Sequence, residues 1–202
     1  ALCPSRHNCI LHLKAERLPR NHMKRIFKYT ISPEDSGSTI TKYLRDLGYS
    51  RHILTHLKYT ERGILQNGSP AYTNRCLFAG DTLTITLLET ESSKNIIPIP
   101  MNLSIIYEDE DILVVDKPAD TPIHPSMDNY ENTLANGIAW YFQKQGIPFI
   151  YRCINRLDRD TTGLLIIAKH MYSASLLSQM SARREIHREY LSIAAGLVPD
   201  SG

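Results

Sequence analysis

The sequence predicts an α+β protein in which a mixed, largely antiparallel sheet forms the main domain and a small α/β module precedes it. Three observations predict this class. Residues 164–168 form a short apolar run after a glycine, which is typical of a buried strand. Residues 82–87 alternate between polar and apolar side chains, which indicates a half-buried strand. Helical periodicity over 133–143 and 172–184 places two helices among the strands of the second half.

Length and composition limit the class of protein. The chain has 202 residues, of which 42% are hydrophobic, so it can bury a core. Its four cysteines have no Cys-x-x-Cys spacing, which favours free thiols in a reducing compartment. No apolar run approaches the roughly 20 residues of a membrane span, and the N-terminus has no hydrophobic signal core. We therefore expect a soluble cytoplasmic protein, a monomer with no membrane partner.

Charge is distributed unevenly along the chain. Residues 1–102 contain 14 Lys and Arg against 8 Asp and Glu, a net charge of +6, whereas residues 103–202 contain 9 against 13, a net charge of −4. The basic half is the expected docking surface for a polyanion, although a solvated basic face would give the same count.

The first half predicts an extension and then a small module. Residues 1–22 have no clear periodicity, and we expect them to be an upstream extension. The module begins with a strand at Met23, and its helices are bounded by capping residues and glycines. An Asn-Gly turn then predicts a hairpin. The expected elements are a strand over 23–29, helices over 39–47 and about 51–60, and strands at 64–66 and 82–87.

The second half begins after a proline-containing linker, which we place at 92–102. Strands are expected at 103–107 and 112–116, joined by an acidic turn that the solvent would cover. An irregular stretch from Lys117 to Asp128 follows, and Thr133 caps the first helix.

The polar stretch from Arg156 to Thr162 lies directly before the buried strand, where catalytic groups tend to be held. If the extended backbone of residues 150–154 continued to Asp158, Arg156 and Asp158 would share one face. An aspartate is ionised at neutral pH, so Asp158 could act as a nucleophile without a neighbouring base. Two alternatives remain open: a turn with an Asx-type hydrogen bond, or a metal held by Asp158 and Asp160, for which two carboxylates make a poor site.

Residues 156–165, Arg-Leu-Asp-x-x-Thr-Thr-Gly-Leu-Leu, resemble the signature of the RluA-type pseudouridine synthases. Asn155 stands where His is usual in that family, and Thr162 stands where Ser is usual. Two other stretches match in the same order: residues 111–126 resemble the family's opening strand and Lys-Pro turn, and residues 188–196 resemble its Lys-x-Tyr-Leu strand.

The resemblance implies an enzyme that isomerises selected uridines in RNA to pseudouridine without a cofactor or metal. By this resemblance Asp158 is the catalytic carboxylate, Arg156 fills the stack left by the flipped nucleotide, and Tyr190 packs against the target ring. The family's catalytic domain continues beyond its Lys-x-Tyr strand. We therefore expect residues 103–202 to form only the N-terminal part of that domain, and these residues alone to be of doubtful activity.

Residues 29–88 resemble the RNA-binding module named after ribosomal protein S-four, and we assign residues 23–91 to it. The resemblance implies that Arg51, Lys58 and Arg62 face RNA, with Lys58 and Arg62 on one helical face. It favours large-subunit ribosomal RNA over transfer RNA as partner. Arg183 and Arg184 would end the last helix, where they either complement its dipole or contact phosphate.

Two other functions are compatible with the same residues. The first is a non-catalytic RNA-binding protein, or an inactive fragment, on the same fold. The second is a metal-dependent hydrolase using Asp158 and Asp160. His52 and His56 have the spacing of a metal pair but no third ligand nearby, and His124 is expected to be architectural rather than a proton carrier.

Overall fold

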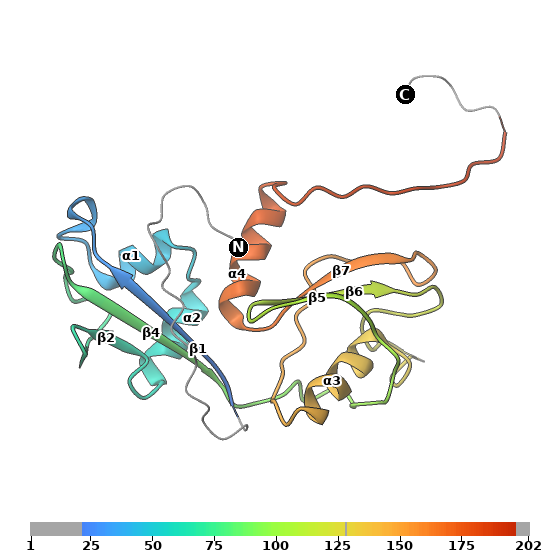
Figure 1. Ribbon diagram of the computed structural model, residues 1–202, viewed down its shortest axis with the longest axis horizontal. Coiled ribbons are helices and arrows are strands. Elements are labelled where there is room, and N and C mark those ends of the chain that lie inside the picture. Colours follow the sequence, from blue (N-terminus) through green and yellow to red (C-terminus); the bar gives the residue numbers. More distant parts are fainter. Residues whose placement is uncertain (1–21, 128, 197–202) are drawn as a thin grey trace.

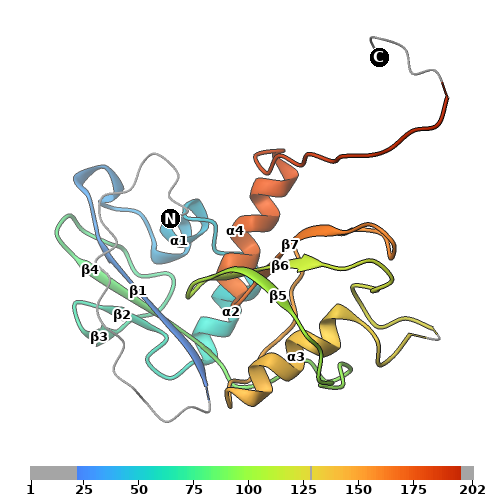
Figure 2. The same ribbon diagram turned by 45° about the vertical axis from the view of Figure 1, so that its right-hand side comes forward.

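The computed structural model describes residues 22–127 and 129–196, so nearly all of the expected extension lies outside the described residues. These residues form two bodies, each with its own sheet and its own hydrophobic cluster. Helix α4 (Met171–Ala182) stands between the two bodies in both views (Figures 1 and 2).

The N-terminal body is a four-stranded antiparallel sheet in the order β1-β4-β2-β3, packed against two helices. Ser50 caps α2 by accepting the N–H of Ile53, as the sequence predicts. Thr39, expected as the first residue of its helix, instead caps α1 by accepting the N–H of Lys42. Asn67 and Gly68 both adopt positive φ, which a tight hairpin turn requires. The elements are β1 (Met23–Thr30), α1 (Ile40–Asp46), α2 (Arg51–Tyr59), β2 (Ile64–Gln66), β3 (Ser69–Pro70) and β4 (Thr82–Glu89), with a short 3₁₀ turn, η1 (Pro33–Asp35).

The second body is a three-stranded antiparallel sheet in the order β5-β6-β7, with α3 (Leu134–Lys144) against one face (Figure 2). Its strands are β5 (Ser104–Glu108), β6 (Ile112–Lys117) and β7 (Gly163–Ala168). Inward-facing residues of β6 and β7 pack with α3 and with residues 147–151. The mixture of helices with an antiparallel sheet confirms the coarse fold class. No parallel strand pair occurs among the described residues, so the mixed character of the sheet is not seen there.

Two expected strands do not form. Residues 150–154 contribute a single bridge, Cys153 to Ile167, and the backbone bends at Ile154 and Asn155. Residues 188–196 pair with no described strand, and Leu191 and Ile193 are fully exposed. Residues 152–154 share two backbone hydrogen bonds with β7 before the chain bends. Residues 188–196 have no described neighbour, and a strand needs a neighbour to hydrogen-bond its backbone.

The expected linker is irregular, and it lies against the second body. The N–H of Ser93 donates to the carbonyl of Phe149 at 3.1 Å, and the Ser93 hydroxyl accepts the N–H of Tyr151 at 2.9 Å. The side-chain amide of Asn136, on α3, donates to the carbonyl of Ile97 at 2.8 Å. These bonds hold the segment on α3 and residues 147–151.

Helix α4 follows the second sheet in sequence but packs into the core of the N-terminal body. Tyr172 stacks on Tyr49 with ring centroids 4.0 Å apart, and its hydroxyl donates to the carbonyl of Leu47 at 2.9 Å. Ser175 and Gln179 both donate to the carbonyl of Gly48, at 2.8 and 3.0 Å. The helix therefore fastens the two bodies together.

Gly48 is needed at this joint for two reasons. Its φ of +92° lies in the left-handed region, and a Cβ there would lie 2.6 Å from Cδ2 of Leu176 on α4. Glycine thus both ends α1 and lets α4 approach.

A polar cluster forms a second joint between the bodies. The Asp111 carboxylate accepts hydrogen bonds from Nε of Arg25 and from Nε2 of His170, each at 2.9 Å. His170 is buried, and its Nδ1 accepts the N–H of Ser173 at 3.2 Å, which caps α4. Because one ring nitrogen accepts, the neutral ring carries its proton on Nε2 and donates to Asp111. Burial acts to raise the pKa of Asp111, but the hydrogen bonds from His170 and Arg25 outweigh it and lower the pKa.

We expect Asp111→Asn to lower the free energy of unfolding by about 1–2 kcal/mol at pH 7, a figure already reduced for the partial exposure of the carboxylate. A lowered folded-state pKa stabilises the protein above the ordinary pKa of about 4, and this contribution is lost as the pH falls. The difference in Tm between the two proteins should therefore shrink between pH 5 and pH 2 to 3. Circular dichroism melts measure it, with Asp116→Asn, an exposed carboxylate on β6, as control. A Tm difference that did not change with pH would contradict this account.

Candidate active site

The stretch from Asn155 to Thr162 forms a loop that enters β7. Its tip rests on the turn that follows β6, far away in sequence. The N–H of Thr121 donates to the carbonyl of Arg159 at 3.3 Å, and the Arg159 guanidinium donates from Nε to the Asp120 carboxylate at 2.6 Å. The loop that carries Asp158 is therefore held by a second chain segment.

Lys117 also holds the tip of the loop, through hydrogen bonds from its side chain. It is the last residue of β6, and the two-residue alternation of the strand places it on the same inward face as Leu113 and Val115. Its side chain is fully buried. Its Nζ donates to the carbonyls of Pro118 at 2.9 Å and of Arg159 at 2.7 Å. Burial lowers the pKa of Lys117, and attraction to the carboxylates of Asp160 and Asp158 partly opposes this. A cation thus lies beneath the acidic loop.

Asp158 itself is exposed. A backbone hydrogen bond closes the turn that follows it, from the N–H of Thr161 to the carbonyl of Asp158 at 3.2 Å. Its carboxylate accepts no hydrogen bond within the described part of the chain, so the Asx-type hydrogen bond is not observed. The side chain is presented to solvent on a fixed loop.

The predicted shared face of Arg156 and Asp158 stays a prediction. The chain bends at Ile154 and Asn155, just before these residues, and both side chains are exposed, whereas Leu157 between them packs against the core of the second body. Arg156 is exposed and makes no ion pair with Asp158 in the described residues. Its charge reaches His124: burial is the main cause that lowers the pKa of this histidine, and repulsion from the Arg156 charge lowers it further. The His124 ring packs edge-on against Tyr151.

Tyr190 lies beside the same loop. A hollow of about 440 Å³ is lined by Asp160, Thr161 and Thr162 on one side and by Glu189, Tyr190 and Leu191 on the other. Tyr190 is 63% exposed, so its ring is available for contact. The structure therefore brings the predicted tyrosine and the predicted aspartate loop together, although Asp158 is not among the residues lining this hollow.

The basic residues expected to contact RNA are exposed on the N-terminal body. Arg51 and Lys58 are seven apart on α2, which puts them on one face about 10 Å apart along the axis. Arg62 does not share that helical face as expected, because α2 ends at Tyr59 and Arg62 has a φ of 52° in the following turn. Helix α4 ends at Ala182, so Arg183 and Arg184 lie just after it, and both are exposed. Arg183 pairs with Glu185 at 2.7 Å.

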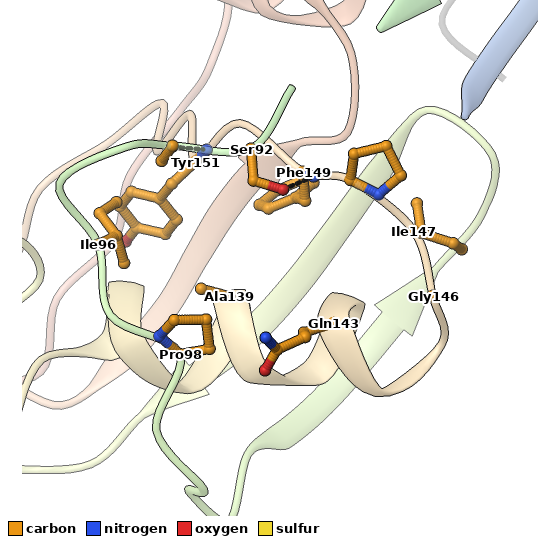
Figure 3. A pocket seen from close by; sticks show the side chains of 11 residues that line it. Ser92, Ile96, Pro98, Ala139, Gln143, Gly146, Ile147, Phe149 and Tyr151 are labelled. Carbon is orange, nitrogen blue, oxygen red and sulfur yellow. Dashed lines mark hydrogen bonds between the residues drawn. The ribbon is translucent and has the colours of Figure 1, made fainter. Parts of the chain in front are cut away.

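A second pocket lies between the linker, helix α3 and the residues that follow it. Figure 3 shows this cavity of about 330 Å³ between the segment at residues 92–98, helix α3 and residues 146–151. The hydroxyls of Ser92 and Ser93 accept hydrogen bonds from the backbone N–H groups of Phe149 and Tyr151. None of its lining residues belongs to the loop of Asp158.

Within residues 22–127 and 129–196, no three His, Cys, Asp or Glu side chains are grouped so that they could hold a metal ion. His56 instead bonds through Nε2 to the carbonyl of Leu88 at 2.9 Å. No helix in the same residues is long and apolar enough to cross a bilayer.

The sequence reading missed two residues that hold the loop, Lys117 and Asn155. Lys117 could have been found, because a lysine in step with Leu113 and Val115 occupies an inward-facing position of a strand. Asn155 was noticed only as a departure from the usual histidine. Its side chain accepts the N–H of Ile166 at 2.9 Å and donates to the carbonyl of Leu164 at 3.0 Å.

Comparison with known proteins finds RNA pseudouridine synthases among the relatives of this chain. The model of the family described as RNA pseudouridylate synthase matches residues 111–202. The Uncharacterized RNA pseudouridine synthase YjbO of Bacillus subtilis (strain 168) is 32% identical over 158 residues, which cover 78% of this chain and 56% of the relative. Ribosomal large subunit pseudouridine synthase D of Neisseria meningitidis is 32% identical over 175 residues, which cover 86% and 46%.

The solved structure titled Human RNA Pseudouridylate Synthase Domain Containing 1 aligns with 41% of this chain and 29% of its own, at 29% identity and a TM-score of 0.33. The chain spans about half the length of the two bacterial relatives. Residues 111–202 contain the loop of Asp158, the turn that holds it and the tyrosine beside it. The model of the RNA pseudouridylate synthase family therefore matches the part of the chain that contains all three features.

Proposed function

We propose that the protein containing this chain isomerises selected uridines of large-subunit ribosomal RNA to pseudouridine, with Asp158 as the catalytic carboxylate. The observation that carries the proposal is an exposed aspartate on a loop fixed at both its neck and its tip, with Tyr190 beside it. An ionised carboxylate needs no further activation to attack. Reactant and product contain the same atoms, so the reaction needs no cofactor.

In this proposal Arg156 occupies the gap left by the flipped nucleotide, and Tyr190 packs against the target ring. Both side chains are exposed on the side of the molecule where the loop is presented, as such contacts require. Extrusion of a base costs a few kcal/mol, and a side chain that fills the stack offsets part of that cost. Arg183 and Arg184 would then contact nearby phosphates.

We assign RNA docking to residues 23–91 as a module of the S-four type, followed by a linker at 92–102 and by the catalytic domain at 103–202. Arg51, Lys58 and Arg62 are its phosphate contacts. Two exposed tyrosines, Tyr59 and Tyr72, add surfaces on which unpaired bases can stack; they are 87% and 85% exposed. Tyr72 follows Ala71, whose N–H donates to the carbonyl of Ile64 at 3.1 Å.

The RNA contacts give a measurable expectation. Replacing Arg51, Lys58 and Arg62 together with glutamine should weaken RNA binding about tenfold or more at low salt. The slope of log K against log[salt] should also become shallower by about 2, because binding releases fewer counterions when phosphate contacts are lost. Fluorescence anisotropy with a labelled ribosomal RNA fragment measures both. Replacing the exposed Lys28, Lys94 and Lys144 is the control matched in charge. Equal losses in the two triple variants would contradict the assignment.

The function itself is tested on ribosomal RNA from cells that lack the full-length protein. Pseudouridine is mapped by a base-specific chemical block to reverse transcription. We expect at least one modified position to lose its block and to regain it when the gene is restored. If every position stayed modified and the purified protein modified none in vitro, a non-catalytic RNA-binding role would replace this proposal. A metal-dependent hydrolase would instead lose its activity with chelator.

A further inference from the structure

We propose that Asn155 is a positioning residue, whose carboxamide fixes the neck of the loop that presents Asp158. The catalytic part of this inference rests on the proposed function. The structural part does not, because it concerns hydrogen bonds within this chain.

The chain enters the loop alongside β7. The N–H of Ala168 donates to the carbonyl of Arg152, and the N–H of Ile154 donates to the carbonyl of Ile166, both at 2.9 Å. At Asn155 the backbone turns away from β7, and the next rung of the ladder has no backbone partner. The Asn155 side chain takes this place, with Oδ1 accepting the Ile166 N–H at 2.9 Å and Nδ2 donating to the Leu164 carbonyl at 3.0 Å.

A carboxamide suits this place because its donor and acceptor lie side by side, as they do along a backbone edge. A carboxylate offers two acceptors, so it would keep the bond to the Ile166 N–H and face the Leu164 carbonyl with like partial charge. The two ring nitrogens of a histidine point in diverging directions and satisfy one of these partners at most. The Cys153 thiol also restrains this residue, by donating a hydrogen bond to the Asn155 carbonyl at 3.0 Å. Burial raises the pKa of that thiol to about 11, so it stays protonated.

These two hydrogen bonds of the Asn155 side chain, which we call the clamp, matter because Asp158 is exposed and its carboxylate accepts no hydrogen bond from a described residue. Its position is set by the two places where the loop is tied down: the tip, at Arg159, and the neck, between Asn155 and residues 164–166. With the neck open, the loop would pivot about its tip. A displacement of about 1 Å at a reacting group can cost up to 10²-fold in rate.

The structural readout is amide hydrogen exchange on the 202-residue chain, followed by NMR. In Asn155→Ala the Ile166 amide should exchange about tenfold faster or more, because it loses its acceptor. In Asn155→Asp the same amide should stay protected, while the Thr161 amide, which closes the turn on Asp158, exchanges faster in both variants. Asn95→Ala, at an exposed asparagine in the segment before α3, is the control and should change neither amide.

The functional readout is pseudouridine formation by the full-length protein. Both Asn155 variants should lose roughly tenfold in kcat, with KM and RNA affinity unchanged, because the loop is misplaced while the RNA contacts remain. Unchanged Ile166 exchange in Asn155→Ala, or an unchanged kcat despite faster exchange, would overturn the proposal. If the wild-type protein formed no pseudouridine, the proposed function would fail, and the exchange data would still decide whether the clamp exists.

Discussion

Asp158→Asn should abolish pseudouridine formation, with a loss of at least about 10³-fold in the single-turnover rate, and leave RNA affinity within about twofold of wild type. Asparagine has nearly the same shape as aspartate but carries no negative charge and is a far weaker nucleophile. The carboxylate accepts no hydrogen bond from a described residue, so the substitution should not disturb the loop. The measurements are single-turnover conversion of a ribosomal RNA fragment and anisotropy for binding.

Asp160→Asn is the matched control for this result. It removes the same charge two residues away on the same turn, and Asp160 is exposed like Asp158. Asp160 lines the hollow beside Tyr190, and its charge acts on Lys117, so a loss of a few-fold is expected. Equal losses in the two variants, together with loss of the wild-type activity in the presence of a chelator, would favour the hydrolase instead. Full activity of Asp158→Asn would refute the catalytic assignment.

Lys117→Met should lower kcat by about 10²-fold with little change in KM, and lower the free energy of unfolding by about 1–3 kcal/mol. Methionine fills a similar volume but cannot donate a hydrogen bond. The carbonyl of Pro118 then loses its side-chain donor, and that of Arg159 keeps only the longer bond from Thr121. The loop tip loses the hold that joins it to β6.

The separation of kcat from stability distinguishes this role from simple support of the fold. Rates should be measured well below the Tm of each variant, where all molecules are folded. Lys28→Met, at an exposed lysine on β1, is the control and should change neither quantity. A loss of stability without a loss of kcat would mean that Lys117 supports the fold and does not place Asp158.

Local patterns predicted most of the elements. Ser50 and Thr133 act as caps where the sequence placed them. A cap is a contact between residues two or three positions apart, so the sequence window contains both partners. The strands β4, β6 and β7 were predicted from alternation or from an apolar run for the same reason.

Errors occurred where a partner distant in the chain decides the outcome. The residues at 188–196 have a strand-like pattern, but no described strand lies beside them. Helix α4 was expected as part of the second body. It packs instead on Tyr49 and Gly48 of the first body, a contact that helical periodicity cannot reveal.

The sequence by itself determined which residue types lie before the buried strand, and the motif there resembles the signature of the family and singles out Asp158 as the candidate carboxylate. Only the tertiary structure decided how that aspartate is held. Lys117 and Arg159 are 42 residues apart, and the turn of Asp120 and Thr121 meets the loop only when β6 pairs with β7. Hydrogen bonds between distant segments depend on how the strands are placed in space, and no local pattern of residues encodes that placement.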